Sequence, residues 1–142
     1  MKNQKQKFRN IQKGFSLLEI LVVMVMMATL IGLVANSVGN SQKKGKIQEA
    51  KIRIGKLKIK IEEFNLDLGY YPRSLEALVN DNGDSNWMGE YVKKKELKDP
   101  WKEEYQYSMP GKNGEDFSII SYGDDKSPGG TKFDKDINSW DI

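Results

Sequence analysis

The sequence contains neither cysteine nor histidine. The lack of cysteine excludes a disulfide framework, a thiolate nucleophile and any zinc or iron–sulfur site with cysteine ligands. The lack of histidine removes the most common general base and the most common transition-metal ligand. We find no other convergent catalytic cluster in the 142 residues. We therefore expect that the protein is not an enzyme.

Acidic residues are missing from residues 1–14, which carry five positive charges. The formal net charge of +3 hides an uneven distribution. Residues 43–60 carry eight positive charges and one negative charge, whereas residues 61–142 carry ten positive and eighteen negative charges. Nucleic acids present a dense row of phosphates, which the acidic C-terminal part matches poorly. We expect no nucleic-acid partner.

One long apolar run, residues 15–38, contains a single charge, Glu19. About 20 apolar residues are enough for a helix to cross a bilayer. The run follows a short basic segment, as in export signals, but it is longer than the core of an ordinary signal peptide and no small-residue cleavage site ends it. A plain single-span anchor is one alternative. Positive charges flank the run on both sides, so charge alone leaves its orientation open.

Proline is absent from residues 15–68, so one long helix can cover this region. After the apolar run, hydrophobic residues recur at alternating intervals of three and four, which favours one face of a helix over a strand. Gly69 and Pro72 are typical of a helix end. The predicted apolar face consists of Ile47, Ala50, Ile54, Leu57, Ile61, Phe64 and Leu68.

A second, thinner apolar stripe lies on the opposite side of this predicted helix. Its members, Ile52, Ile59 and Leu66, recur every seven residues. A helix packed on one domain needs only one apolar stripe. Either these residues are scattered surface hydrophobics, or they contact other copies of the same protein.

The rest of the chain predicts a small region of short elements. Ser74 is a candidate N-cap for a short helix around residues 74–79, and a polar loop follows at residues 80–86. Residues 105–109 and 117–122 are short runs typical of two antiparallel strands joined by a loop. We expect the C-terminal loop to contain no strand.

The segment from Lys13 to Glu19 reads KGFSLLE and carries the first chemically informative motif. A carboxylate inside a membrane span costs about 2.5 to 3.5 kcal/mol, so Glu19 calls for a partner. Cleavage after Gly14 would create one, because the new α-amino group of Phe15 is a cation at neutral pH. That amine could pair with Glu19 of its own helix or of a neighbouring helix. Pairing between chains would fix the axial stagger of a helical bundle.

This motif resembles that of the type IV pilin superfamily, whose members carry a short basic leader, a glycine, a phenylalanine and a glutamate at the fifth mature position. The resemblance implies that a prepilin peptidase cleaves between Gly14 and Phe15 and methylates the new amine of Phe15. It also implies that Glu19 acts in assembly, that the leader is cytoplasmic and that residues 40–142 are exported.

Within this superfamily, the rest of the chain is similar to the major pseudopilins of type II secretion systems, the G-type subunits. The similarity rests on Gly69-Tyr70-Tyr71-Pro72, on Asp99-Pro100-Trp101 and on Asp134-Lys135-Asp136-Ile137. One departure is Asn36, where the family commonly has proline. The alternative is a pilin of a type IV pilus or DNA-uptake filament, which the absence of the cysteine pair found in many such pilins disfavours.

The resemblance implies a pilin-like α+β fold, with a long N-terminal helix packed on a small antiparallel β-sheet. It divides the chain into a leader (1–14), a transmembrane and assembly helix (15–39), an amphipathic outer half of the helix (40–71) and a periplasmic head (72–142). It implies a single-pass inner-membrane protein that assembles into a helical homopolymer, the pseudopilus, which drives export of folded proteins through the outer membrane. The implied partners are other copies of the chain, the prepilin peptidase, minor pseudopilins and the inner-membrane assembly platform.

Four aspartates, Asp124, Asp125, Asp134 and Asp136, lie in a Gly- and Ser-rich segment after the second predicted strand. Oxygen ligands without histidine or cysteine are the set that Ca²⁺ prefers. The spacing does not match an EF-hand, and on spacing alone a solvated turn is the more common explanation. The resemblance implies a calcium site with side-chain ligands from Asp125, Asp134 and Asp136 and carbonyl ligands from Tyr122 and Ser127. It leaves Asp124 undecided.

Overall fold

The computed structural model describes residues 14–142, and of Asn36 and Ser37 it describes only the backbone. The predicted leader therefore lies outside the described residues, except for Gly14. The chain divides into two compact units, residues 1–39 and residues 40–142. Helix α1, Leu17–Leu68, begins in the first unit and ends in the second.

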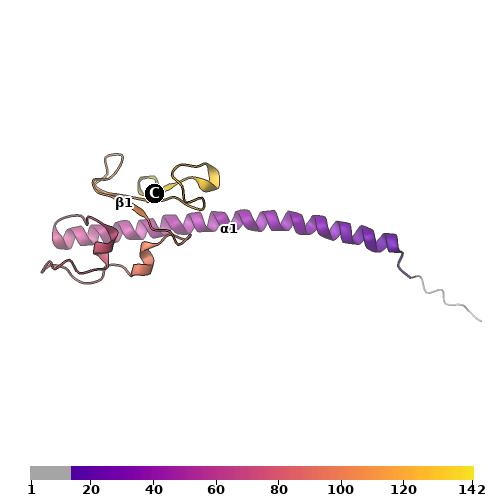
Figure 1. Ribbon diagram of the computed structural model, residues 1–142, viewed down its shortest axis with the longest axis horizontal. Coiled ribbons are helices and arrows are strands. Elements are labelled where there is room, and N and C mark those ends of the chain that lie inside the picture. Colours follow the sequence, from indigo (N-terminus) through magenta and orange to yellow (C-terminus); the bar gives the residue numbers. More distant parts are fainter. Residues whose placement is uncertain (1–13) are drawn as a thin grey trace, which may run out of the picture. The chain divides into compact units, whose positions relative to one another are not determined.

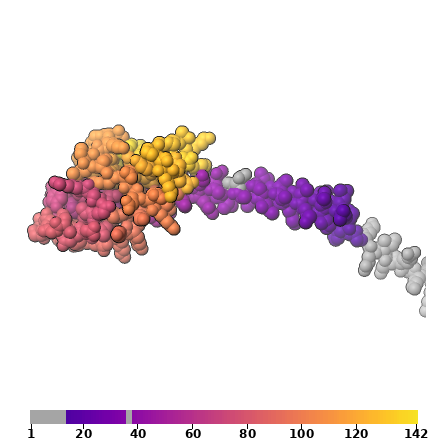
Figure 2. All heavy atoms as spheres, viewed as in Figure 1, coloured from indigo at the N-terminus to yellow at the C-terminus, as the bar shows by residue number. Residues whose placement is uncertain are grey.

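In the first unit, α1 presents an apolar surface that the chain itself leaves uncovered. Every large apolar side chain from Phe15 to Val38 is exposed, with exposed fractions from 43% to 90% (Figure 2). Among the residues that the structure describes, α1 is the one helix long and apolar enough to cross a membrane. A surface of this kind is stable only against lipid or against other protein.

In the second unit, the outer half of α1 supplies one side of the hydrophobic core. Ala50, Ile54, Leu57, Ile61 and Phe64 are at most 2% exposed, and Ile47 and Leu68 pack partly buried against the same core. The prediction of a helix rather than a strand is therefore confirmed. Figure 1 shows the chain after this helix folded back along it.

The end of α1 is set by the predicted glycine. Gly69 has φ +79°, a left-handed conformation that costs glycine little. Its amide donates to the carbonyl of Asn65 at 2.8 Å, which satisfies one of the last carbonyls of the helix. Three residues on, Pro72 is fully buried, so the chain leaves the helix directly into the core.

A three-stranded antiparallel sheet with the order β1-β2-β3 covers the core. Strands β1 (Gln106–Ser108) and β2 (Ser118–Ser121) form the predicted hairpin, with Tyr107 opposite Ile119. Strand β3 (Ile137–Asn138) pairs with β2, so the expectation of a strandless C-terminal loop is wrong. Two residues are too few to show the alternation by which a strand is recognised in a sequence. Burial of Ile137 nevertheless fixes the pairing.

The other elements are single turns of 3₁₀-helix: η1 (Leu75–Leu78), η2 (Lys94–Leu97), η3 (Lys132–Asp134) and η4 (Ser139–Asp141). Element η1 confirms the short helix predicted after Pro72, with Leu75 and Leu78 buried. Ser74 occupies the N-cap position of η1, as predicted, although its side chain makes no capping hydrogen bond. The hydrogen bond at the start of η1 comes from the backbone instead: the Ala77 amide donates to the Ser74 carbonyl at 3.2 Å, as in a 3₁₀ turn.

Candidate functional sites

The predicted cleavage site lies in non-helical backbone immediately before α1. Gly14, Phe15 and Ser16 have no helical structure, and Phe15 is 81% exposed. A peptide bond in such a segment can enter the active site of a peptidase without prior unwinding of a helix. The bond between Gly14 and Phe15 is therefore structurally accessible for the predicted cleavage.

Glu19 lies in the first turn of α1, where a negative charge is favoured by the free amide groups of the helix. Its backbone amide donates to the Ser16 hydroxyl at 3.1 Å, so Ser16 is the N-cap of the helix. This role of Ser16 was not predicted from the sequence. The signal was present, because Ser-x-x-Glu before an apolar run is the capping-box pattern. Ser16 thus fixes where the helix starts relative to Phe15 and Glu19.

In the second unit, a buried carboxylate ties the Asp-Pro-Trp segment to the sheet. Asp99 is 2% exposed. One of its oxygens accepts from the amides of Trp101 and Glu103, each at 2.9 Å, and the other accepts from the Ser121 hydroxyl at 2.6 Å. The Ser121 oxygen in turn accepts from the amide of Gly123 at 3.3 Å. Asp99 therefore positions the end of β2, where the candidate calcium loop begins.

The candidate calcium residues occupy that loop and its return to β3. Asp136 lies where the loop closes, since one of its oxygens accepts from the Gly129 amide at 2.9 Å and its own amide donates to the Gly129 carbonyl at 3.1 Å. Asp134 ends η3, and Tyr122 directly follows β2. Asp125 and Ser127 form a separate exposed turn, in which the Ser127 amide donates to Asp125 Oδ1 at 3.3 Å.

One observation on this loop favours a cation. Oδ1 of Asp136 is buried and has no hydrogen-bond partner, although a buried carboxylate oxygen normally accepts at least one hydrogen bond. The donor set contains only oxygen, as Ca²⁺ requires. Within residues 14–142, however, no three acidic side chains lie close enough together to hold a metal in this conformation. The calcium site stays a prediction, and it requires the predicted aspartate ligands to come closer together than they do in this conformation.

The sequence left undecided whether Asp124 is a calcium ligand. In the structure, Asp124 pairs with Lys43 of α1 at 3.3 Å. Several other residues of the basic stretch 43–60 also find partners within the chain. Arg53 pairs with Glu49 at 2.6 Å, Lys60 pairs with Glu63 at 2.6 Å, and Lys58 donates to the Ser139 carbonyl at 2.9 Å. Part of this positive charge is therefore paired within the second unit itself, in exposed ion pairs that contribute little to its stability.

Tyr71, in the predicted helix-end motif, connects two segments far apart in the sequence. Its hydroxyl lies 3.2 Å from Glu62 of α1 and 3.3 Å from Asp116 in the loop between β1 and β2. Burial, the hydrogen bond to Glu62 and the charges of both carboxylates raise the pKa of Tyr71 to about 12. The phenol is therefore a neutral donor at any physiological pH.

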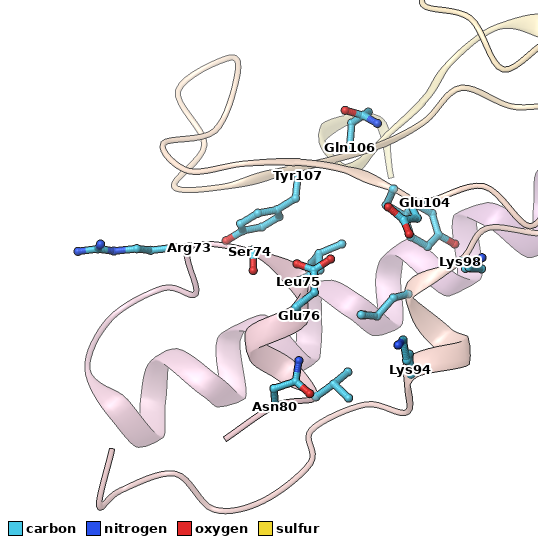
Figure 3. A pocket seen from close by; sticks show the side chains of 13 residues that line it. Arg73, Ser74, Leu75, Glu76, Asn80, Lys94, Lys98, Glu104, Gln106 and Tyr107 are labelled. Atoms are coloured by element: carbon cyan, nitrogen blue, oxygen red, sulfur yellow. The ribbon is translucent and has the colours of Figure 1, made fainter. Parts of the chain in front are cut away.

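A cavity of about 380 Å³ opens between η1, η2 and β1 (Figure 3). Its lining mixes charges of both signs, including Lys94, Lys98, Glu76 and Glu104. The Tyr107 hydroxyl donates to the Pro72 carbonyl at 2.8 Å and so ties β1 to the segment that follows α1. None of the predicted site residues lines this cavity.

Taken together, the α+β fold, the exposed apolar helix and the N-terminal motif define a membrane-anchored subunit of pilin-like fold. The model of the prokaryotic N-terminal methylation motif matches residues 9–35, and the model of type II secretion system protein G matches residues 37–140. The chain belongs to the type II secretion system protein G family.

Relatives in this family cover nearly the whole chain. The type II secretion system core protein G of Xanthomonas campestris pv. campestris is 43% identical over 127 residues, which are 89% of this chain and 88% of the relative. The core protein G of Pseudomonas aeruginosa is 36% identical over 140 residues, which are 94% of this chain and 98% of the relative.

A solved structure supports the same assignment. The crystal structure of the major pseudopilin from the type 2 secretion system of enterohaemorrhagic Escherichia coli has a TM-score of 0.59 to this chain and is 27% identical. The match covers 75% of this chain and 96% of that one. The pilin-like fold expected from the sequence is thus confirmed. The family consists of structural subunits of a secretion system, which also confirms that the protein is not an enzyme.

Proposed function

We propose that this chain is the major pseudopilin of a type II secretion system and polymerises into the periplasmic pseudopilus that drives export of folded proteins. The observation that carries this proposal is the exposed apolar half of α1 in a member of the protein G family. Lipid covers this surface before assembly, and the same surface of other copies covers it in the filament. The apolar half of α1 thus moves from lipid to an equally apolar environment among other helices. This exchange makes polymerisation from the membrane energetically possible.

The proposed topology is a single pass through the inner membrane, with the leader in the cytoplasm and residues 40–142 in the periplasm. The methylation motif at the N-terminus and the polar, net acidic character of residues 61–142 support it. The proposed partners are other copies, the prepilin peptidase, minor pseudopilins and the inner-membrane assembly platform. Protease added to the periplasmic side should degrade residues 40–142, and full protection of this region would refute the topology.

Processing is proposed to cut between Gly14 and Phe15 and to methylate the Phe15 amine. Mass spectrometry of the membrane-bound protein should then show a chain that starts at methylated Phe15. An intact leader in a host with an active prepilin peptidase would refute the processing.

Glu19 is proposed to pair with the Phe15 amine of a neighbouring copy and so set the axial position of each new subunit. Glu19→Gln keeps the size of the side chain and removes its charge, so it should abolish filaments while the protein remains in the membrane. Thr29→Ala is a matched control in the same span, because the Thr29 hydroxyl donates to the carbonyl of Met26 in its own helix. Normal filaments from Glu19→Gln would exclude charge pairing.

The secretion role is tested by deleting the gene and measuring the secretion of folded proteins, twitching motility and DNA uptake in the same strain. Loss of secretion alone is expected. Normal secretion with loss of twitching or of DNA uptake would favour a pilin of a type IV pilus or DNA-uptake filament instead.

Ca²⁺ is proposed to bind the loop through Asp125, Asp134 and Asp136, with carbonyl oxygens of Tyr122 and Ser127. It would neutralise crowded carboxylates and satisfy the buried oxygen of Asp136. Calcium added to a fragment of residues 40–142 should raise its melting temperature, whereas Asp125→Ala should not respond. Asp81→Ala, outside the loop, should respond like the natural sequence. An unchanged melting temperature of the natural fragment would exclude the site.

A further inference from the structure

A groove in the second unit lies along the face of α1 that carries Ile59. It has a volume of about 550 Å³, and Leu57, Ile59, Tyr91 and Val92 form its apolar floor. Ile59 is 59% exposed, and Ile52 and Leu66, the other members of the second stripe, are 52% and 81% exposed. The groove is therefore an open apolar surface next to a helix face that the chain does not cover.

The rim of this groove is positively charged. Arg53, Lys56, Lys60 and Lys95 line it, against only two acidic residues, Glu63 and Glu96. Lys60 and Glu63 pair with each other at 2.6 Å, and Arg53 pairs with Glu49 at 2.6 Å. Among the described residues, Lys56 and Lys95 are therefore the cations of the rim without an acidic partner, and Glu96 accepts from the backbone amide of Lys93 at 2.9 Å. An occupant with an apolar centre and negative flanks would match both the floor and the rim.

The loop over residues 80–90 has these properties. Met88 is 77% exposed, and the loop carries Asp81, Asp84 and Glu90 but no positive charge. The loop is held in shape by its own hydrogen bonds, from the Gly83 amide to Asp81 at 2.7 Å and from the Asn86 amide to Asp84 at 3.0 Å. A preformed loop loses little conformational entropy on binding, and a methionine side chain adapts to an irregular apolar groove.

We propose that the 80–90 loop of one copy docks into this groove of the next copy, with Met88 on the apolar floor and the three carboxylates against the basic rim. Met88 is exposed, so it does not fill the groove of its own chain. The loop ends at Glu90, directly before Tyr91 of the groove. In the proposed filament the same screw operation relates each copy to the next, so the loop of one copy meets the groove of the next and the contact is head-to-tail. This inference rests on the proposed filament and names the contact between the second units of successive copies.

Cross-linking can test this contact directly, because the natural chain has no cysteine. The full-length chain carrying Met88→Cys and Ile59→Cys is produced with its secretion system and treated with a short bismaleimide. A ladder of covalent multimers is expected from the double variant, and no ladder from either single variant. Met88→Cys combined with Lys112→Cys, an exposed position outside the groove, should also give no ladder. A second pair, Glu90→Cys with Lys56→Cys, should reproduce the ladder.

Charge reversal gives an independent measurement on the same double-cysteine background. Lys56→Glu with Lys95→Glu should slow cross-linking about threefold to tenfold, because both changes place negative charge against the acidic loop. Lys112→Glu with Lys135→Glu makes the same change in net charge elsewhere and should leave the rate unaltered.

Electron microscopy of the same cells separates the two proposals. Filaments without a ladder from either cysteine pair would overturn the docking contact and leave the proposed function intact. A band that joins the Ile59→Cys chain to a different protein would overturn the contact in the same way. Absence of filaments from the natural sequence, with secretion normal, would overturn the proposed function itself.

Discussion

Replacement of Asp99 tests how the second unit is held together. Its carboxylate is 2% exposed and accepts three hydrogen bonds, two from backbone amides at 2.9 Å and one from Ser121 at 2.6 Å. Hydrogen bonds to a charged group contribute about 1.5 to 3 kcal/mol each, but three bonds to one side chain are not additive. Asp99→Ala leaves all three donors without an acceptor inside the protein. We expect a loss of about 3 to 5 kcal/mol in the free energy of unfolding.

Asp99→Asn separates the hydrogen bonds from the charge. The amide oxygen can still accept from the two backbone donors, and Ser121 can reverse its role and accept from the amide nitrogen. The expected loss is about 1 to 2 kcal/mol, which reflects the weaker acceptor. Asp124→Asn is the matched exposed control, because its ion pair with Lys43 at 3.3 Å leaves both side chains at least 40% exposed. That change should cost at most about 1 kcal/mol.

Urea denaturation of the 40–142 fragment measures these differences. With a slope of about 1.5 kcal/mol per molar urea, Asp99→Ala should lower the midpoint by about 2 to 3 M and Asp99→Asn by about 1 M. A loss below about 1 kcal/mol for Asp99→Ala would refute a stabilising role for the buried carboxylate. Equal losses for the two variants would show that the charge, and not the set of acceptors, is what the fold requires.

Gly130→Ala should lower the stability of the fragment by about 2 kcal/mol or more, because Gly130 has φ +80° and an added Cβ would overlap the carbonyl oxygen of Asp134; an unchanged melting temperature would contradict this. Ile61→Ala should cost about 2 to 5 kcal/mol, whereas Ile59→Ala on the same helix should stay within about 0.5 kcal/mol, because Ile61 is buried and Ile59 is 59% exposed. The phenol of Tyr71 titrates at about 12 in the folded chain, against about 10 when unfolded. Its contribution is complete below pH 10 and is lost as the pH rises toward 12, so Tyr71→Phe should flatten the fall in stability measured between pH 9 and 11.

The helix and the hairpin could be predicted because their signals extend over many residues. The three-four pattern between Ile47 and Leu68 covers six turns, and each buried member of it contacts the core. Gly69 and Pro72 mark the helix end through backbone rules that hold in any context. The hairpin is recognisable because two short runs rich in β-branched and aromatic residues flank a Pro- and Gly-containing loop.

Other features depend on contacts between distant segments and leave little trace in the sequence. Strand β3 exists because Ile137 reaches the core beside Ser121, sixteen positions earlier in the chain. Element η2 is a single turn whose only buried residue is Leu97. Asp99 resembles an ordinary turn aspartate in sequence, and only the fold brings Ser121 to its second oxygen. The N-cap role of Ser16, by contrast, could have been predicted from its spacing to Glu19.

The C-terminal segment shows how this chain closes its last loop without a disulfide. Ser139 is 2% exposed, and its hydroxyl accepts from the Ile119 amide at 3.0 Å in the central strand. Its carbonyl accepts from Lys58 of α1 at 2.9 Å, so one residue ties the C-terminus to both the sheet and the helix. Because these contacts lie after β3, they hold the segment from Ile137 onward independently of any bound ion. We therefore expect that the proposed calcium ion would affect residues 122–136, which connect two anchored ends and carry the buried, unpartnered oxygen of Asp136.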